Sequence, residues 1–291
     1  KHNLLSISQI CEKEHYVTFC KNDCQIYNNI IRDDSYAVEL YQMSGILIGG
    51  GSSCDCYNNQ IYDGKGDGID VFGMGFMKIY NNLIVRPGMT FQPGNPNEHK
   101  SGIYIGSVIG ALSPGATFSI YNNTIISPKS FGITYNNPNA TMGYIANNLI
   151  TNPGTLDING DAAYINLMNG NDKITSSNNY LSPNNTLPRF LSSSNDNYDL
   201  EPDSPAINYG ISLTSEGITF DIENRFRPFH TYFDAGAYEC HDPYALVEEN
   251  NEIIGIPYPT PANDNINIPL NTITNNPITI KIISLDGRII L

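Results

Sequence analysis

Apolar and polar residues alternate with a period of two in a series of short segments along the chain. These segments read GILIG from Gly45, GIDVF from Gly68, GIYIG from Gly102, GITYN from Gly132 and, more weakly, AYINL from Ala163. A period of two is that of a β-strand with one buried face, and glycine permits a bend between sheets. Apolar residues never recur at intervals of three and four over a useful length, so the pattern predicts strands and not helices.

A second kind of segment repeats around a pair of asparagines. Its copies are IYNNII at Ile26, CYNNQI at Cys56, IYNNLI at Ile79, IYNNTI at Ile120, IANNLI at Ile145 and SSNNYL at Ser176. Successive copies lie 23 to 41 residues apart, a spacing typical of stacked solenoid coils. Asn tolerates left-handed backbone angles, and stacked Asn side chains can hydrogen-bond from coil to coil. The repeat predicts an all-β fold, a right-handed single-stranded parallel β-helix with a corner at each pair.

The same alternation separates inward from outward positions. Residues two and four before the first Asn, and three after it, are mostly apolar and are predicted to face inward. The tyrosine before each of four pairs has the opposite parity and is predicted to face outward. Cys24 and Cys54 share an inward column on consecutive coils, about 4.8 Å apart. That spacing permits a disulfide; a buried pair of thiols fits equally well, and Cys20 with Cys24 is a rival disulfide.

Charge and composition narrow the function classes. Charged residues make up 15% of the 291 residues, and the net charge is -14. This balance argues against nucleic-acid binding, which needs clustered Lys and Arg. No run of eighteen apolar residues is present, so we expect no transmembrane segment. The chain opens without the layout of a signal peptide, and we expect that the natural protein begins further upstream.

Beyond Leu181 the repeat gives way to a different pattern. It comprises Tyr198 to Gly210, then Asp221, Arg225, Arg227 and Pro228, and then Asp234 to Glu239. This pattern resembles the closing region of secreted, pectate-lyase-like β-helix proteins. The resemblance implies one β-helix domain over residues 1–240, with a cap over about 182–240. An open β-helix end exposes unpaired strand edges, so we expect the charged residues of this region to form a capping ion network.

The end of the chain carries a second resemblance. Residues 241–255 look like a linker, and residues 256–291 contain the start Pro257-Tyr258-Pro259, a strand from Ile278 to Ile283, and Asp286-Gly287-Arg288. Residues 256–291 resemble a partial C-terminal sorting domain of the Bacteroidetes type nine secretion system, although Thr260 replaces the usual Asn and several strands of the family are missing. The resemblance implies a short β-sandwich-like segment, the type nine secretion machinery as partner, and a secreted or outer-membrane-surface protein of a Gram-negative bacterium. The same strands would also build a small Ig-like module.

The most polar neighbourhood of the predicted coils suggests a catalytic site. We assign catalytic roles to Lys65, Arg86, His99 and Lys100, substrate binding to Asp70 and Tyr104, and metal binding to Asp63, Asp67 and Glu98. A lyase acting on a uronic acid needs a base, for which a lysine or His99 would serve, and a cation beside the enolate. Arg86 would hold the carboxylate, and the acids would hold Ca²⁺, a hard cation that takes oxygen ligands. In a solenoid the same residues are also common as solvated turn positions.

Two functions of different classes remain open at this stage. The first is a polysaccharide lyase that cleaves an acidic polysaccharide by β-elimination. The second is a non-catalytic surface module that binds a glycan or another cell-surface partner through outward Tyr and Asn residues. A glycoside hydrolase of the polygalacturonase type ranks lower, because only Asp67 and Asp70 echo its motif. We expect a monomer, since β-helix ends are usually capped.

Overall fold

The computed structural model describes residues 10–12, 16–18, 24–33, 44–91, 100–106, 117–137, 142–154, 164–169 and 173–241. The chain divides into two compact units, residues 1–241 and 242–291. Only the first unit contains described residues. The predicted linker beyond residue 241 and the predicted sorting segment therefore lie outside the described residues.

The described part of the first unit is built from strands and two short 3-10 turns. The strands are β1 (Ile10–Glu12), β2 (Tyr16–Thr18), β3 (Cys24–Tyr27), β4 (Ile30–Arg32), β5 (Ile46–Tyr57), β6 (Gln60–Tyr62), β7 (Ile69–Tyr80), β8 (Leu83–Val85), β9 (Ile103–Gly106), β10 (Thr117–Tyr121), β11 (Thr124–Ile126), β12 (Ile133–Asn136), β13 (Met142–Ala146), β14 (Leu149–Thr151), β15 (Ile165–Asn169), β16 (Ile174–Ser177), β17 (Tyr180–Ser182), β18 (Phe190–Ser192) and β19 (Asn197–Leu200). The turns are η2 (Ser193–Asn195) and η3 (Thr214–Glu216).

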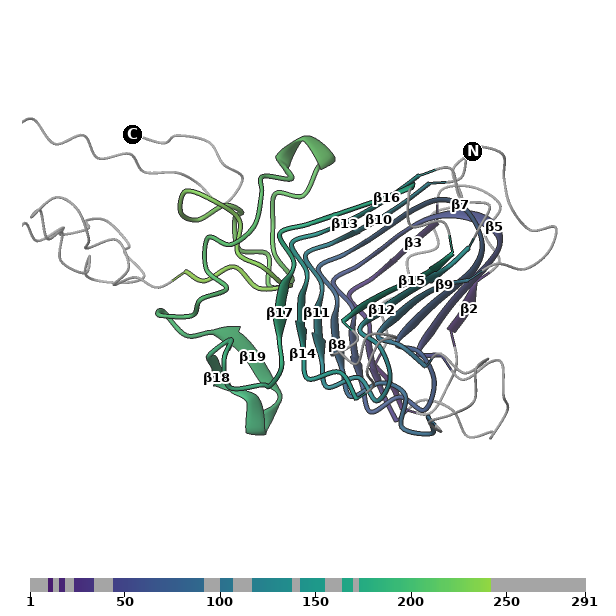
Figure 1. Cartoon of the computed structure of the whole chain (residues 1–291), viewed down its shortest axis with the longest axis horizontal. Coiled ribbons are helices and arrows are strands. Elements are labelled where there is room, and N and C mark those ends of the chain that lie inside the picture. The colour runs from purple at the N-terminus through teal and green to yellow at the C-terminus, as the bar shows by residue number, and fades with distance from the viewer. Residues whose placement is uncertain are drawn as a thin grey trace, which may run out of the picture. The chain divides into compact units, whose positions relative to one another are not determined.

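Parallel pairing stacks these strands into coils. One sheet has seven strands in the order β1-β4-β6-β8-β11-β14-β17, and a ten-stranded sheet contains the other strands up to β16. The long strands β5 and β7 pair with different neighbours along their two halves: β7 pairs with β9 near its start and with β10 near its end. The ten-stranded sheet therefore supplies two faces of each coil and the seven-stranded sheet a third (Figure 1). This arrangement confirms the predicted parallel β-helix.

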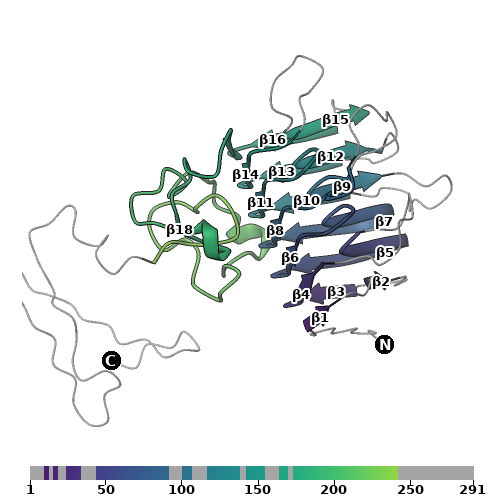
Figure 2. The same cartoon turned by 90° about the horizontal axis from the view of Figure 1, so that it is seen from below.

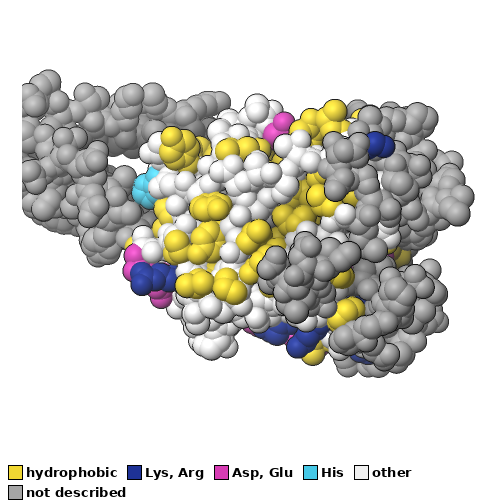
Figure 3. Space-filling model, in the orientation of Figure 1, with side chains coloured by type: hydrophobic (Ala, Val, Ile, Leu, Met, Phe, Trp, Pro, Cys, Tyr) yellow, Lys and Arg dark blue, Asp and Glu magenta, His cyan; other side chains and the backbone are white. Residues whose placement is uncertain are grey.

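Aliphatic columns fill the interior of the coils, as predicted. Ile31, Ile61, Ile84, Ile125 and Ile150 occupy one column, and each side chain is at most 1% exposed. The next residue of that column, Leu181 in the last described coil, is 44% exposed. Figure 3 shows apolar side chains gathered on the face of the molecule where the C-terminal coils lie. The interior is thus closed along the coils and open at β17.

The two asparagines of each corner have different roles. The first Asn has a positive φ, between 49° and 58° in all six corners, and makes the left-handed bend. The second Asn turns its amide inward. Its Nδ2 donates to Oδ1 of the second Asn in the next coil, in the order Asn29, Asn59, Asn82, Asn123, Asn148 and Asn179, at 2.8 to 2.9 Å. The backbone N–H of each rung except the last donates to the same oxygen. The corners therefore stack through a continuous amide ladder.

Residues 183–241, which we call the strap, lie alongside the coils and not over their open end (Figure 2). Apolar strap residues such as Phe190, Leu200 and Ala237 pack on Leu83 and Leu149, which face outward from the seven-stranded sheet. The expected position of this segment as an end cap is therefore corrected. An apolar outer face forms on this sheet, and burying it along several coils removes more apolar surface from water than covering one end.

The expected ion network does form, inside the strap. Arg225 Nε donates to Asp221 at 2.7 Å, and its terminal nitrogens bind Asp199 at 2.8 and 3.0 Å. Arg227 and Glu239 form a fully buried pair with an N–O distance of 3.2 Å. The network holds the strap's own loops together.

The cysteine columns also follow the prediction. Cys24 and Cys54 are register partners on neighbouring strands, and both side chains are 2% exposed. Both are thiols in this structure. The hydrogen bond that the Cys54 thiol makes to Cys24, together with burial, raises the pKa of Cys54, which keeps it in the unreactive protonated form. Cys20 lies outside the described residues.

Candidate functional site

Arg86 is held by carboxylates of the chain itself. It follows β8 at a left-handed corner with a φ of 52°. Its Nε and Nη2 bind the two oxygens of Asp63 at 2.5 and 2.8 Å, and Nη1 and Nη2 bind Asp196 of the strap at 2.8 and 3.2 Å. These hydrogen bonds raise the pKa of Arg86 and lower that of Asp196. The guanidinium fork predicted to clamp a substrate carboxylate therefore anchors the strap, and both oxygens of Asp63 are engaged.

The two predicted lysines lie near each other around one turn. Lys100 precedes β9 and is 7% exposed, and its Nζ donates to Thr90 Oγ1 at 2.7 Å and to the Thr90 carbonyl at 3.1 Å. Thr90 Oγ1 in turn donates to the carbonyl of Lys65 at 2.8 Å. Thr90 thus joins the two segments, and the ammonium of Lys100 is directed at that loop.

Asp67, Asp70 and Tyr104 gather on the outer face of β7 and β9. Asp70 and Tyr104 are register partners, as the sequence predicts, and the Asp67 carboxylate accepts a hydrogen bond from the backbone N–H of Ser101. Asp67 and Asp70 are 3% and 7% exposed. Burial raises the pKa of Tyr104, Asn136 opposes the shift by hydrogen bonding, and Asp70 and Asp67 add to it. These two buried acids and the phenol are the part of the predicted site that the structure brings together.

Two predicted residues, Glu98 and His99, lie outside the described residues. Within the ranges that the structure describes, no three His, Cys, Asp or Glu side chains gather in a way that could hold a metal ion. Asp63 is occupied by Arg86. These observations do not fit a calcium site built on Asp63 and Asp67, and the contribution of Glu98 stays a prediction.

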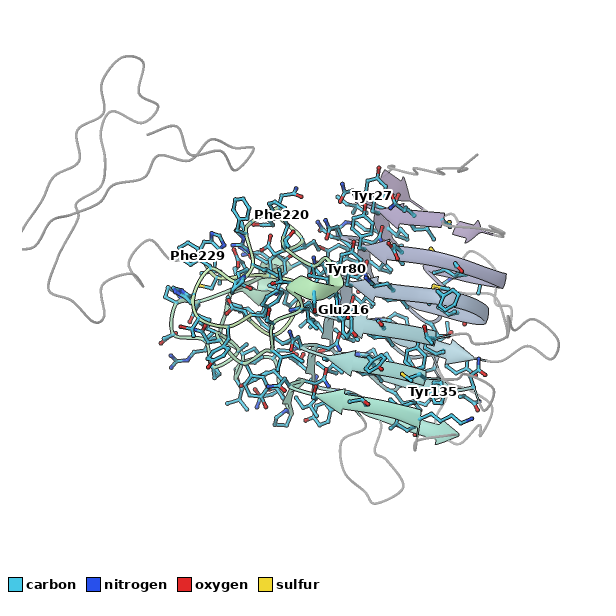
Figure 4. All side chains as sticks on the ribbon, turned by 90° about the horizontal axis from the view of Figure 1, so that it is seen from above. Tyr27, Tyr80, Tyr135, Glu216, Phe220 and Phe229 are labelled. Carbon is cyan, nitrogen blue, oxygen red and sulfur yellow. The ribbon has the colours of Figure 1, made fainter. Side chains whose placement is uncertain are left out.

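A second candidate surface lies on the outer face of β3, β10, β13 and the C-terminal halves of β5 and β7. We call it the aromatic strip. Tyr27, Tyr57 and Tyr80 stack on consecutive coils, with ring centroids 5.0 and 4.9 Å apart and nearly parallel planes. Phe76 and Tyr144 are 60% and 38% exposed. Figure 4 shows Tyr27 and Tyr80 along the sheet margin that faces the strap.

Polar groups lie among these rings. Asp55 and Lys78 are register partners on β5 and β7, and Lys78 Nζ also donates to the carbonyl of Glu216 in the strap at 2.7 Å. Ser119 continues the same column on β10. The strip therefore combines exposed aromatic area with hydrogen-bonding groups at the spacing of the strands.

The sequence predicts the tyrosine column but not the rest of the strip. Phe76 and Tyr144 have the outward parity of their strands, yet their exposure depends on where the strap stops. Tyr121 continues the tyrosine column and is 5% exposed, because strap residues Leu213 and Ile218 pack on it. The alternation of apolar and polar residues would find the column, whereas only the fold shows which part of it stays open.

The fold and these two surfaces define the class: the chain is a parallel β-helix protein with a lateral strap. The fold is compatible with a carbohydrate-active or surface protein. A comparison of the sequence with models of known families and with curated proteins finds no match. Among the described residues, no helix is long and apolar enough to cross a membrane.

Proposed function

We propose that this protein binds a polysaccharide on the aromatic strip. The observation that carries the proposal is the exposure of Phe76 and Tyr144 on the same sheet face as the stacked tyrosines. Large exposed aromatic side chains on a regular sheet face mark interaction surfaces. Ring faces pack against the apolar faces of sugars, while phenolic hydroxyls remain available for hydrogen bonds.

The polar groups of the strip suit a glycan because they are few and spread out. Asp55, Lys78 and Ser119 share one outward column and could hydrogen-bond to sugar hydroxyls. Lys78 forms an ion pair with Glu216, whose carboxylate lies 3.9 Å from the Lys78 Nζ. The strip thus has no concentrated charge of either sign among its described residues, and we expect binding to depend weakly on salt.

Affinity electrophoresis through gels that contain a panel of neutral and acidic polysaccharides tests the proposal. We expect at least one polysaccharide to retard the native chain, and Phe76→Ala and Tyr144→Ala each to reduce the retardation. Tyr232→Ala is the matched control, because Tyr232 is 55% exposed but belongs to the strap. The proposal fails if no polysaccharide retards the native chain. It also fails if Tyr232→Ala reduces the retardation as much as Phe76→Ala and Tyr144→Ala do.

A second candidate is the polysaccharide lyase predicted from the sequence. The cluster of Asp67, Asp70 and Tyr104 supports it, since buried acids beside a phenol are typical of proton-transfer sites. Lys100, or His99 if its loop reaches the same face, would act as the base. Arg86 and calcium have no role in this candidate, because Arg86 and Asp63 neutralise each other.

Ultraviolet absorbance of unsaturated products, measured with acidic polysaccharides, decides on this candidate. A signal that is lost in Tyr104→Phe and unchanged in Tyr144→Phe would support a lyase centred on Tyr104. If no polysaccharide gives an unsaturated product and at least one still retards the chain in the gel, the protein binds polysaccharide without cleaving it. Secretion and surface attachment through residues 256–291 belong to the same proposal, and surface labelling of cells expressing the natural gene would test them.

A further inference from the structure

The first asparagine of each corner forms an outward column that contacts the backbone of the strap. Nδ2 of Asn81 donates to the carbonyl of Phe220 at 2.7 Å, and Nδ2 of Asn122 to that of Asp234 at 2.9 Å. The next two corners continue the series, with Asn147 bound to the Ile211 carbonyl at 2.8 Å and Asn178 to the Tyr209 carbonyl at 3.1 Å. Four consecutive coils thus bind polypeptide carbonyls through the same atom.

Asn147 binds both polar atoms of one peptide residue of the strap. Besides donating to the Ile211 carbonyl, its Oδ1 accepts the Ile211 backbone N–H at 2.9 Å. A primary amide and a peptide group therefore pair through both of their polar atoms. A Cβ on the preceding Gly210 would stand 2.8 Å from Cγ and Nδ2 of Asn147, so the close approach requires glycine.

The contacts also fix the direction of the bound segment. Tyr209 and Ile211 are two residues apart and contact Asn178 and Asn147 on neighbouring coils. A fully extended chain would advance about 6.6 to 6.8 Å over two residues, against about 4.8 Å between coils, and the strap bends at Gly210 between its two contacts. At these two corners the column therefore binds a segment that bends at a glycine between the two contacting residues.

The same column continues past the strap at Asn28 and Asn58. Their φ values of 57° and 53° match those of the four occupied corners, and Tyr27 and Tyr57 stack beside them. No hydrogen bond joins either side chain to the described residues of the strap. Oδ1 of Asn58, like that of Asn81 in an occupied corner, is buried without a hydrogen-bond donor in the described structure.

We propose that Asn28 and Asn58 form a docking site for a segment of a partner protein that bends at a glycine. The backbone carbonyls of the segment would accept hydrogen bonds from the asparagine Nδ2 groups, as those of the strap do on the following coils. Its continuity with the strap interface is what favours a polypeptide over a glycan here. The site adjoins Tyr27 and Tyr57 at one end of the aromatic strip, and it does not rest on the proposed polysaccharide binding, which the Phe76 and Tyr144 variants test separately.

A peptide that copies the strap provides the probe. A fluorescent synthetic peptide of residues 205–212 contains both contacting residues and Gly210. We expect saturable binding to the native chain by fluorescence anisotropy, weakened about fivefold or more by Asn58→Gly, the worth of one hydrogen bond. Glycine keeps the left-handed corner and removes the amide. Asn224→Gly is the matched control, because Asn224 is exposed and has a φ of 63° away from the column.

A photoreactive version of the peptide locates the bound segment. Cross-links to residues 24–33 or 53–60 are expected, and cross-links to the coils of Asn122 and Asn147 would mean that the peptide displaces the strap and would overturn the proposal. Absence of binding, or equal affinity of Asn58→Gly and native chain at matched thermal stability, would overturn it as well. The proposal would also be overturned if no peptide binds but retardation by a polysaccharide depends on Asn58, since the asparagine column would then bind a sugar.

Discussion

Replacing Asn82 by alanine breaks one rung of the inward amide ladder. The Asn82 side chain is fully buried, and its Oδ1 accepts from both the backbone N–H and Nδ2 of Asn59 at 3.0 and 2.9 Å. Its Nδ2 donates to Asn123 Oδ1 and to the carbonyls of Cys56 and Tyr80 at 2.9 to 3.1 Å. Alanine can make none of these bonds, and no water-filled surface is near to replace them.

The cost follows from the groups that remain. The buried N–H of Asn59 loses its acceptor, which costs about 1–3 kcal/mol, and each of the four other hydrogen bonds of the Asn82 amide contributes about 0.5 kcal/mol, because its two amide hydrogens are shared among three acceptors. We therefore expect Asn82→Ala to lower the free energy of unfolding by roughly 3–5 kcal/mol. This is a large loss for a chain whose whole stability is about 5–15 kcal/mol.

The neighbouring asparagine provides the control. Asn81→Gly keeps the left-handed corner and removes one hydrogen bond, to the Phe220 carbonyl, so we expect a loss of about 1 kcal/mol. Urea unfolding followed by far-ultraviolet circular dichroism measures both variants. If Asn82→Ala costs no more than Asn81→Gly, the ladder does not stabilise the coils and the reasoning is refuted.

Three further outcomes are expected. Arg86→Ala should lower the free energy of unfolding by roughly 1–2 kcal/mol, since the ion pairs of Arg86 with Asp63 and Asp196 are partly exposed. The same variant should speed amide hydrogen exchange in β18 and β19. Unchanged exchange in these strands would contradict the role of Arg86 in anchoring the strap. Burial raises the Glu239 pKa to about 7 from 4.5, so the folded chain holds this proton more tightly, and stability should fall by roughly 1–3 kcal/mol as pH rises from 4.5 to 7, with no further change above. Glu239→Gln should flatten that curve, and a flat native curve would contradict the shift. Cys24 and Cys54 should react with a thiol reagent only after unfolding, as read by mass spectrometry of the peptides that contain them, whereas failure of both to react in the unfolded chain would indicate a disulfide.

The coils were predictable because their signal is local. The period of two and the recurring Asn pairs place Ile61, Ile84 and Ile125 inward and Tyr57 outward, and the structure confirms each of them. Stacking identical corners needs no information from distant parts of the chain. The same holds for the register of Cys24 with Cys54.

The site was less predictable because its partners are distant in sequence. Arg86 stands 110 residues before Asp196. The sequence around Arg86 does not indicate that a second carboxylate will bind its guanidinium. The sequence pattern of the strap specifies an ion network but not the face on which it packs. The exposure of Phe76 and the burial of Tyr121 both follow from that docking.

Hydrogen exchange at the corner amides tests the stacked architecture most directly. The backbone N–H groups of Asn59, Asn82, Asn123 and Asn148 each donate to the amide oxygen of the next rung at 3.0 Å. We predict that these amides exchange only on global unfolding, far more slowly than the exposed turn amide of Gly217. Exchange of the four asparagine amides as fast as that of Gly217 would contradict the ladder and the β-helix built on it.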